Sequence, residues 1–244
     1  MQMPAPASVA PPTSRALVYP TVWSIVRLVG ALAILAAIAN QLVVTVGNAL
    51  QATTPYGSHV PTVIANFLSF FTIESNLGTA IVLILAAIWG LRSRGAGPEP
   101  RWLAIPLACT ATYMIVTGVV YNTLLRNIEL PQGTTVAWAN EMMHVVAPLL
   151  MLADVLFAPR RRCLGWGIVG VIAAFPILWA VYTLVRANLV INPRTGAHSW
   201  YPYPFLDPAN VGGYAGVAAY IAGIAVVIIV AGTGVVWASR KRGS

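Results

Sequence analysis

The sequence predicts an all-α membrane protein, a polytopic bundle of six transmembrane helices with both termini in the cytoplasm. Of its 244 residues, 58% are hydrophobic and only 8% are charged, and the apolar residues gather into six long runs. A soluble domain usually carries about 25% charged residues. Too few polar side chains remain for a hydrated surface, which excludes a soluble enzyme and a nucleic-acid-binding protein.

Each apolar run is long enough to cross a bilayer, which takes about 20 mainly apolar residues. The first run exceeds the roughly 7–15 residues of a signal-peptide core, so we expect it to stay as an anchor. Residues 1–18 are expected to form a disordered tail, residues 19–238 one transmembrane domain, and residues 239–244 a basic cytoplasmic tail. The expected helices cover residues 19–47, 66–91, 102–125, 134–158, 164–189 and 212–238.

Basic residues divide unequally between the two sides of this bundle. Ten of them fall on one side, namely Arg15, Arg92, Arg94, Arg101, Arg160, Arg161, Arg162, Arg240, Lys241 and Arg242. Only Arg126 and Arg194 fall on the other. Because Lys and Arg concentrate in cytoplasmic loops, the first side is predicted to be cytoplasmic. Topology and attraction to lipid headgroups then explain the net charge of +8, without nucleic acid as a partner.

Polar residues concentrate in the outer halves of the predicted helices, whereas the inner halves offer chiefly Arg27 and Asp154. At 1.5 Å per residue, Thr72 and His144 both lie roughly 9–15 Å below the outer face. Intramembrane polar groups normally face a cavity or one another, so a polar cleft is expected there. Its residues are Thr72, Glu74, Ser75, Asn76, Tyr121, Asn122, Arg126, Asn140, Glu141, His144, Tyr182, Arg186 and Asn188.

The residue types in this cleft indicate nucleophilic chemistry. His144 is the only histidine inside an expected helix, and an imidazole in apolar surroundings is a candidate base. The hydroxyl of Thr72 or Ser75 becomes a useful nucleophile when a neighbouring base removes its proton. Asn140 and Glu141 precede His144 by four and three residues, so they share its helical face and either could orient the ring. A carboxylate beside the ring would favour the protonated imidazole.

Each candidate also has a structural alternative. A threonine in a membrane helix usually bonds the carbonyl four residues back, which for Thr72 is that of Leu68. His144 could be a hydrogen-bonded structural histidine. The charged residues of the cleft could form ion pairs that fix helix packing, and these are Glu74, Glu141, Arg126 and Arg186.

Several membrane chemistries lack the residues that they require. A single histidine in the helices excludes a b-type haem bundle, and the only lysine, Lys241, lies in the tail and cannot hold retinal. The sequence contains no HExxH metal motif, no Gly-x-Ser-Gly and no phosphate loop. Neither a cofactor nor a metal is therefore expected.

Three segments resemble the androgen-induced hydrolase family of six-pass membrane proteins, and the similarity extends over all six helices. They are Phe-Phe-Thr-Ile-Glu-Ser-Asn at 70–76, Trp-Ala-Asn-Glu-Met-Met-His at 138–144 and Trp-Tyr-Pro-Tyr-Pro-Phe-Leu-Asp at 200–207, the last similar to the bacterial branch. By this resemblance Thr72 and His144 form a catalytic pair that hydrolyses fatty-acid esters of hydroxy fatty acids.

The residue chemistry and the resemblance agree on Thr72 and His144, and together they favour the catalytic interpretation. The predicted partners are membrane lipid and a hydrophobic ester substrate that enters laterally from the bilayer. A donor for the carbonyl oxygen is also required. The sequence does not choose among its candidates, which are Asn140, Asn76, Tyr182 and Arg186.

The sequence leaves open the role of one outer segment and an alternative function. The proline- and aromatic-rich segment 192–213 could be an interfacial cap over the cleft or a loop that merely covers helix ends. The chain could instead be a small transporter or a lipid or ligand sensor in which His144, Glu141 and Arg186 relay protons or bind a carboxylate. No internal repeat of the kind many transporters show is visible. A purely structural subunit would not be expected to gather polar residues on one side.

Overall fold

The computed structural model describes residues 14–93, 97–128 and 135–243, and all regular structure in these ranges is helical. The helices are α1 (Ser14–Gln51), α2 (Val60–Leu68), α3 (Phe71–Arg92), α4 (Arg101–Val120), α5 (Ala137–Glu141), α6 (Ala147–Phe157), α7 (Ile168–Ala187) and α8 (Tyr214–Arg242). Two π-helical turns, η1 (Tyr121–Leu125) and η2 (Met142–Val146), follow α4 and α5, and a short 3₁₀ turn, η3 (Pro204–Leu206), precedes α8.

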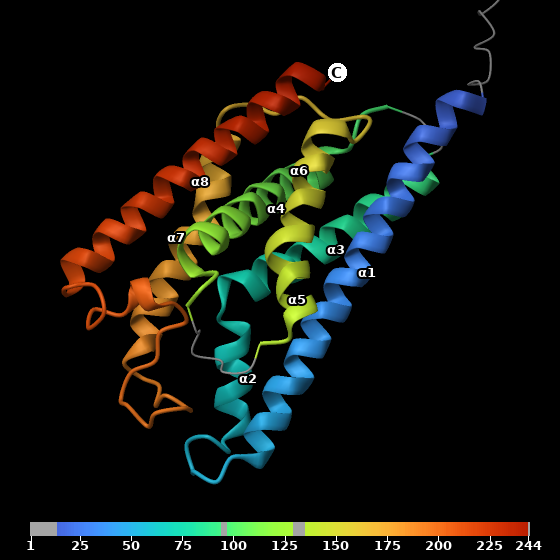
Figure 1. Ribbon diagram of the computed structural model, residues 1–244. Coiled ribbons are helices and arrows are strands. Elements are labelled where there is room, and N and C mark those ends of the chain that lie inside the picture. Colours follow the sequence, from blue (N-terminus) through green and yellow to red (C-terminus); the bar gives the residue numbers. More distant parts are fainter. Residues whose placement is uncertain (1–13, 94–96, 129–134, 244) are drawn as a thin grey trace, which may run out of the picture.

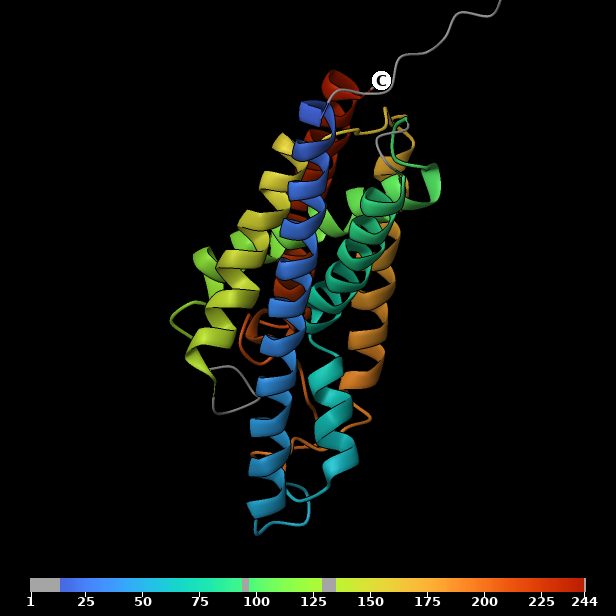
Figure 2. The same ribbon diagram turned by 90° about the vertical axis from the view of Figure 1, so that its right-hand side faces the viewer.

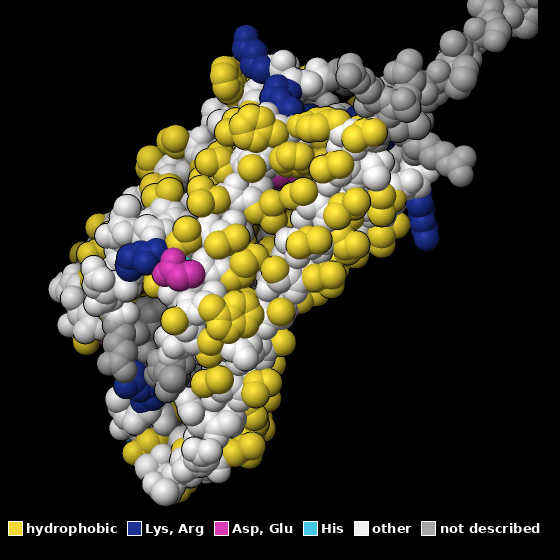
Figure 3. Space-filling view, turned by 45° about the vertical axis from the view of Figure 1, so that its right-hand side comes forward, with side chains coloured by type: hydrophobic (Ala, Val, Ile, Leu, Met, Phe, Trp, Pro, Cys, Tyr) yellow, Lys and Arg dark blue, Asp and Glu magenta, His cyan; other side chains and the backbone are white. Residues whose placement is uncertain are grey.

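Six segments are long and apolar enough to cross a membrane, which confirms the predicted all-α bundle of an integral membrane protein. They are Val18–Gln51, Phe71–Arg92, Arg101–Leu125, Ala137–Phe157, Ile168–Ala187 and Tyr214–Arg242. Figure 3 shows hydrophobic side chains spread along the flank of the molecule, with few charged ones among them. Such a surface is suited to lipid contact.

Helix boundaries differ from the prediction at three places. Helix α1 begins at Ser14, so residues 14–18 are helical, while residues 1–13 of the expected tail lie outside the described residues. Helix α8 continues to Arg242, so most of the expected basic tail is helical. The expected helix 66–91 covers α3 and only the end of α2, which begins at Val60, and the chain turns between the two helices at Ser69 and Phe70.

The helices pack with α4 near the centre of the bundle, where it contacts α3, α6 and α8 (Figure 1). Helix α1 runs along α3 on one side, and α7 packs with α8 on the other (Figure 2). Small residues such as Ala31, Ala80 and Ala86 are fully buried, so the helices can approach one another closely. In lipid, such van der Waals packing holds helices together because no hydrophobic driving force acts between them.

The start of α1 and the end of α8 lie at the same end of the bundle (Figure 1). Both contact the end of α6 there: Tyr19 Oη donates to the carbonyl of Phe157, and the Arg242 guanidinium donates to those of Val155 and Ala158. The opposite end carries α2, the start of α5 and the segment before α8.

A buried ion cluster of Arg27, Glu99, Asp154 and Arg161 ties the helices together near the chain termini. Arg27 donates to Glu99 and to Asp154 at 2.7 Å each, and Arg161 also pairs with Asp154. The Trp23 indole N–H also donates to Asp154 Oδ1 at 2.6 Å. Asp154 therefore fixes α1, α6 and the following loop, and it is committed to this cluster rather than to His144.

Candidate active site

The turn between α2 and α3 places Thr72 in the first turn of α3. Phe70 has an extended backbone, with φ −71° and ψ 127°, and helical geometry resumes at Phe71. Thr72 therefore has no continuous helix before it, and its hydroxyl bonds two side chains from other elements rather than the carbonyl of Leu68. Its backbone N–H, which lacks a helical acceptor in the first turn, donates to Tyr203 Oη at 3.2 Å.

Thr72 and His144 meet as a hydrogen-bonded pair. Thr72 Oγ1 lies 3.2 Å from His144 Nε2, and His144 Nδ1 lies 2.9 Å from the carbonyl oxygen of Asn140. A carbonyl only accepts hydrogen bonds, so Nδ1 carries the ring proton and the neutral ring presents Nε2 as an acceptor. Thr72 therefore donates its hydroxyl proton toward Nε2. Both side chains are buried, with 8% and 5% of their surfaces exposed.

Tyr203 completes the chain of hydrogen bonds, and sequence reasoning did not single it out. Its Oη lies 3.2 Å from Thr72 Oγ1 as well as from the Thr72 nitrogen. Because Oη accepts from the backbone N–H and Oγ1 donates to His144, the Tyr203 hydroxyl donates to Oγ1. Burial raises the pKa of Tyr203 to about 12, which keeps this donor protonated. The segment 192–213 thus covers the site directly.

The π-helical turn η2 carries His144 and frees a carbonyl beside it. The N–H of Ala147 donates to Met142, five residues back, instead of to Met143. Asn76 of α3 fills the vacancy, because its Nδ2 donates to the Met143 carbonyl at 3.2 Å and also to the Thr72 carbonyl at 2.9 Å. Asn76 therefore joins the two chain segments that carry Thr72 and His144, although the sequence suggested it as a donor to the carbonyl oxygen.

Pro148 frees a second carbonyl, that of His144 itself. Proline has no N–H to donate four residues back, and Asn122 Nδ2 supplies the missing donor at 3.2 Å. Gly118 makes this approach of α4 possible, since a Cβ there would lie 2.9 Å from the Pro148 ring. The backbone of His144 is thus held by amides from two neighbouring helices.

The imidazole ring is fixed by stacking. The ring of Tyr121 lies parallel to that of His144, with centroids 3.9 Å apart and an interplanar angle of 21°. Asn140 Nδ2 donates to Tyr121 Oη. Asn140 therefore orients His144 in two ways: its carbonyl accepts from the ring, and its side chain holds the stacked tyrosine.

Glu141 is engaged with Arg126, whereas the His144 ring is oriented by the Asn140 carbonyl. The Glu141 carboxylate pairs with Arg126 through two hydrogen bonds of 2.9 and 3.1 Å, just beyond η1. Glu141 is thus a surface ion pair beside the site, which was the structural alternative for both residues.

Tyr182 and Arg186 are likewise engaged elsewhere. Tyr182 Oη bonds Ser69 Oγ at 3.1 Å, and Arg186 donates to Asn66 Oδ1 at 2.7 Å and lies over the ring of Trp200. Both residues therefore hold α2 and the outer segment. The amides of Asn76 and Asn140 are also committed, so Tyr203 is the donor that the described structure brings to Thr72 Oγ1.

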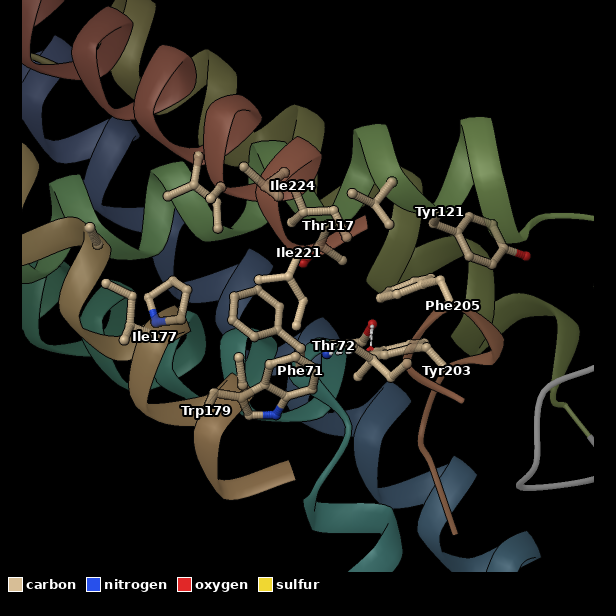
Figure 4. Close-up of a pocket in the computed structure, with 18 of the residues that line it drawn as sticks. Phe71, Thr72, Thr117, Tyr121, Ile177, Trp179, Tyr203, Phe205, Ile221 and Ile224 are labelled. Atoms are coloured by element: carbon tan, nitrogen blue, oxygen red, sulfur yellow. Dashed lines mark hydrogen bonds between the residues drawn. The ribbon is translucent and has the colours of Figure 1, made fainter. Parts of the chain in front are cut away.

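A large apolar cavity begins at Thr72 and runs between α4, α7 and α8; we call it the acyl cavity (Figure 4). It holds about 970 Å³ of empty space, part of it in an open mouth. Thr72 and Tyr203 line it, and so do Ile177 and Ile229, which are both exposed on the bundle flank. The expected polar cleft is thus an apolar cavity, because the polar side chains are used in bonds to one another.

No protein-family model, curated protein or solved structure matches this chain. The resemblance to the androgen-induced hydrolases therefore stays a prediction, and the chemistry assigned to the site depends on the contacts of its own atoms.

Proposed function

We propose that the protein is an integral membrane hydrolase that cleaves lipid esters, with Thr72 as nucleophile and His144 as base. The observation that carries this proposal is the hydrogen bond between Thr72 Oγ1 and His144 Nε2, beside the acyl cavity that Thr72 lines. A nucleophile beside a base that is itself oriented by a third group is the arrangement that activates a hydroxyl. Here the third group is the carbonyl of Asn140.

In the first half of the reaction, His144 Nε2 takes the proton of Thr72 as Oγ1 attacks the ester carbonyl carbon. The tetrahedral intermediate collapses when the bond from carbon to the alcohol oxygen breaks. The departing oxygen takes the proton from Nε2, and the acyl group stays on Thr72. In the second half, Nε2 takes a proton from water, which attacks the acyl carbon. Thr72 Oγ1 then leaves with that proton, and a fatty acid is released.

The carbonyl oxygen becomes negative in both halves and needs a preorganised donor. Tyr203 O–H donates to Thr72 Oγ1 at 3.2 Å in the free protein, and we assign it to the carbonyl oxygen once Oγ1 has bonded to the carbonyl carbon. The first turn of α3 adds a favourable field, because a helix N-terminus stabilises negative charge. Tyr203 thereby takes the role for which the sequence offered Asn140, Asn76, Tyr182 and Arg186.

The substrate enters from the bilayer, since the edge of the acyl cavity at Ile177 and Ile229 faces the lipid flank. By the sequence resemblance, the substrates are fatty-acid esters of hydroxy fatty acids. We place the protein in a bacterial plasma membrane, with both termini cytoplasmic and the site toward the non-cytoplasmic side. Reporter fusions after Arg162 and Ser244 should be active only inside, and a fusion at Thr195 only outside.

The direct test is labelling of the purified protein in nanodiscs with a fluorophosphonate probe, followed by peptide mapping. The label is expected on Thr72, and both Thr72→Ala and His144→Ala should abolish it. Ser75→Ala is the matched control, because the Ser75 hydroxyl contacts the Thr72 carbonyl and Thr117 instead of His144. Labelling that maps to Ser75, or that survives in Thr72→Ala, would refute the mechanism.

A further inference from the structure

One part of the acyl cavity lies between α7 and α8, and we call it the acyl arm. Its lining from these two helices includes Ala173, Pro176, Ala180, Ile221, Ala225 and Ile228. All six side chains are apolar. In Figure 4, Ile177 of α7 lies well apart from Tyr203, with Thr72 between them. The cavity therefore continues beyond the proposed nucleophile along α7.

The near end of the acyl arm is level with the site. On α7, the Trp179 ring lies 5.9 Å from the ring of Tyr203, which contacts Thr72. On α8, the Tyr220 ring stacks on that of Phe205 at 5.8 Å, and Phe205 stacks on Tyr203 at 5.2 Å. On each helix the next residue along the chain lines the arm, so both walls begin beside the site.

Both walls continue for the same length toward the end of the bundle that carries the chain termini. On α7 the lining extends from Ala180 back to Ala173, and on α8 it extends from Ile221 to Ile228. Helix α7 begins at that end of the bundle and α8 finishes there, so the two walls lead the same way (Figure 1). At 1.5 Å per residue each wall is about 10 Å long.

Tight packing of three helices closes the far end. Gly232 lies one turn beyond Ile228 on α8. A Cβ added there would lie 3.4 Å from Ile172 Cγ2 of α7 and 3.7 Å from Thr112 Cγ2 of α4. Ile172 directly precedes Ala173, and both Ile172 and Thr112 are fully buried. These contacts form a floor about 10 Å from the site, by the helical rise.

The covalent step decides which half of an ester the arm can hold. When Thr72 Oγ1 bonds to the carbonyl carbon and the alcohol leaves, the acyl chain stays attached to Thr72, which lines the acyl cavity. An extended chain advances about 1.2 Å per bond, since a residue of three backbone bonds spans about 3.3–3.6 Å. A length of about 10 Å therefore accommodates roughly eight bonds.

We propose that the acyl arm is the subsite for the acyl chain and that its floor limits this chain to about eight to ten carbon atoms. This assignment rests on the proposed hydrolase function and narrows the substrate to hydroxy-fatty-acid esters whose acyl half is of medium length. The chain enters between Ile177 and Ile229, which line the cavity and are exposed on the lipid flank. A longer chain meets the floor and has to bend sideways between these two residues.

The first test is a panel of esters of one hydroxy fatty acid that differ only in acyl length, assayed with purified protein in nanodiscs. The acyl groups are octanoyl, decanoyl, tetradecanoyl and palmitoyl. We expect kcat/KM for the decanoyl ester to exceed that for the palmitoyl ester by at least about tenfold, since a misfit of one methylene in an apolar pocket costs about 10–200-fold. A flat dependence or a preference for palmitoyl would overturn the assignment and leave the hydrolase function intact.

Two filling variants test the place of the chain. Ala173→Phe fills the far end of the arm, and Ala225→Phe fills it nearer the site, about 6 Å beyond Ile221 by the helical rise. Both should shorten the longest acyl chain that is hydrolysed, and Ala225→Phe should shorten it more. Ala174→Phe and Ala222→Phe are the matched controls, because these alanines are exposed on the same helices. Equal shifts in the controls, or the reverse order of the two filling variants, would contradict the assignment.

A photoreactive probe follows the chain in the unmodified protein. The probe is a fluorophosphonate with a decyl chain that ends in a diazirine. Thr72 Oγ1 bonds to phosphorus as fluoride leaves, and light then cross-links the chain end to its surroundings. We expect cross-links in α7 near Ala173 and in α8 near Ile228. If Thr72 is labelled, cross-links to α1 or α5, or to lipid alone, would overturn the assignment. Absence of the label on Thr72 would instead refute the function on which it rests.

Discussion

The bundle contains two buried polar regions, the ion cluster near the chain termini and the Thr72–His144 site at the other end, and they are built from opposite kinds of group. The cluster joins four charged side chains, with Asp154 paired to both Arg27 and Arg161. The site joins a hydroxyl, an imidazole and a phenol in one chain of hydrogen bonds. The ion cluster holds helices and a loop together, whereas Thr72 of the site also lines a large cavity.

This difference shows why charge alone is a poor guide to chemistry in a membrane protein. Buried charges cost so much free energy that they are normally paired, and the charges of this cluster pair with one another rather than facing a substrate. A neutral hydroxyl and a neutral imidazole need fewer partners, so one face of Thr72 stays available to the acyl cavity.

The largest loss of activity is expected when Thr72 or His144 is replaced. Thr72→Ala and His144→Ala should each lower kcat/KM by at least about 10³-fold, and the double variant should be little worse, because residues that act as one unit are not additive. The thermal midpoint should change little, since both side chains make neutral contacts. Additive losses in the ester-hydrolysis assay would show that the two residues act independently.

The opposite pattern is expected at the ion cluster. Asp154→Asn removes the charge that faces Arg27 and Arg161, and breaking a buried pair in this way costs about 3–5 kcal/mol. The unfolding midpoint in detergent should fall strongly, while the protein that remains folded should keep its kcat. Loss of kcat at an unchanged midpoint would mean that the cluster takes part in the chemistry.

Tyr203→Phe tests the donor for the carbonyl oxygen with the ring contacts preserved. Removing one such donor typically lowers kcat by about 10²–10³-fold, and KM should change little. Tyr201→Phe is the matched control, because Tyr201 is a buried tyrosine of the same segment. Equal losses in the two variants would indicate that the segment matters only for packing.

The pKa of Tyr203 also sets a pH expectation. An ordinary tyrosine ionises near pH 10, whereas burial raises the pKa of Tyr203 to about 12. The raised pKa favours the protonated form in the folded state, so this donor is fully present below pH 10 and is lost only as the pH rises through about 12. Activity that falls between pH 9 and 10 in the wild type, and not in Tyr203→Phe, would contradict this assignment.

Much of the fold was predictable because each helix that crosses a bilayer needs about 20 mainly apolar residues. The expected helix 102–125 corresponds to the span Arg101–Leu125, and the other spans agree within several residues. The meeting of Thr72 and His144 was also predicted, since both lie at a similar depth in helices that run in the same direction. Hydropathy and the 1.5 Å rise of a helix are sufficient for such statements.

Local departures from regular helix were not predictable in the same way. The turn at Ser69 and Phe70 and the π-helical turn η2 both interrupt stretches that apolar composition predicts as continuous helix. The contact of Tyr203 with Thr72 spans 131 residues, and no periodic pattern records it. The missed donor Tyr203 and the ion pair of Glu141 with Arg126 are both contacts between separate chain segments.

The smallest effect is expected at Glu141. Its ion pair with Arg126 is half exposed, with 46% of the Glu141 side chain and 40% of the Arg126 side chain accessible. Exposed pairs contribute only about 0–1 kcal/mol, so Glu141→Gln should hardly change the thermal midpoint, in contrast to Asp154→Asn. Spacing in a regular helix placed this carboxylate beside His144, and on that basis the substitution should move the acidic limb of the pH–rate profile. Because the opposite charge of Arg126 accompanies that of Glu141, we expect hydrolysis still to fall in acid as His144 takes up a proton, with the limb at nearly the same pH in Glu141→Gln and wild type. A limb that moves to lower pH in the variant would show that the carboxylate acts on the imidazole across the turn η2.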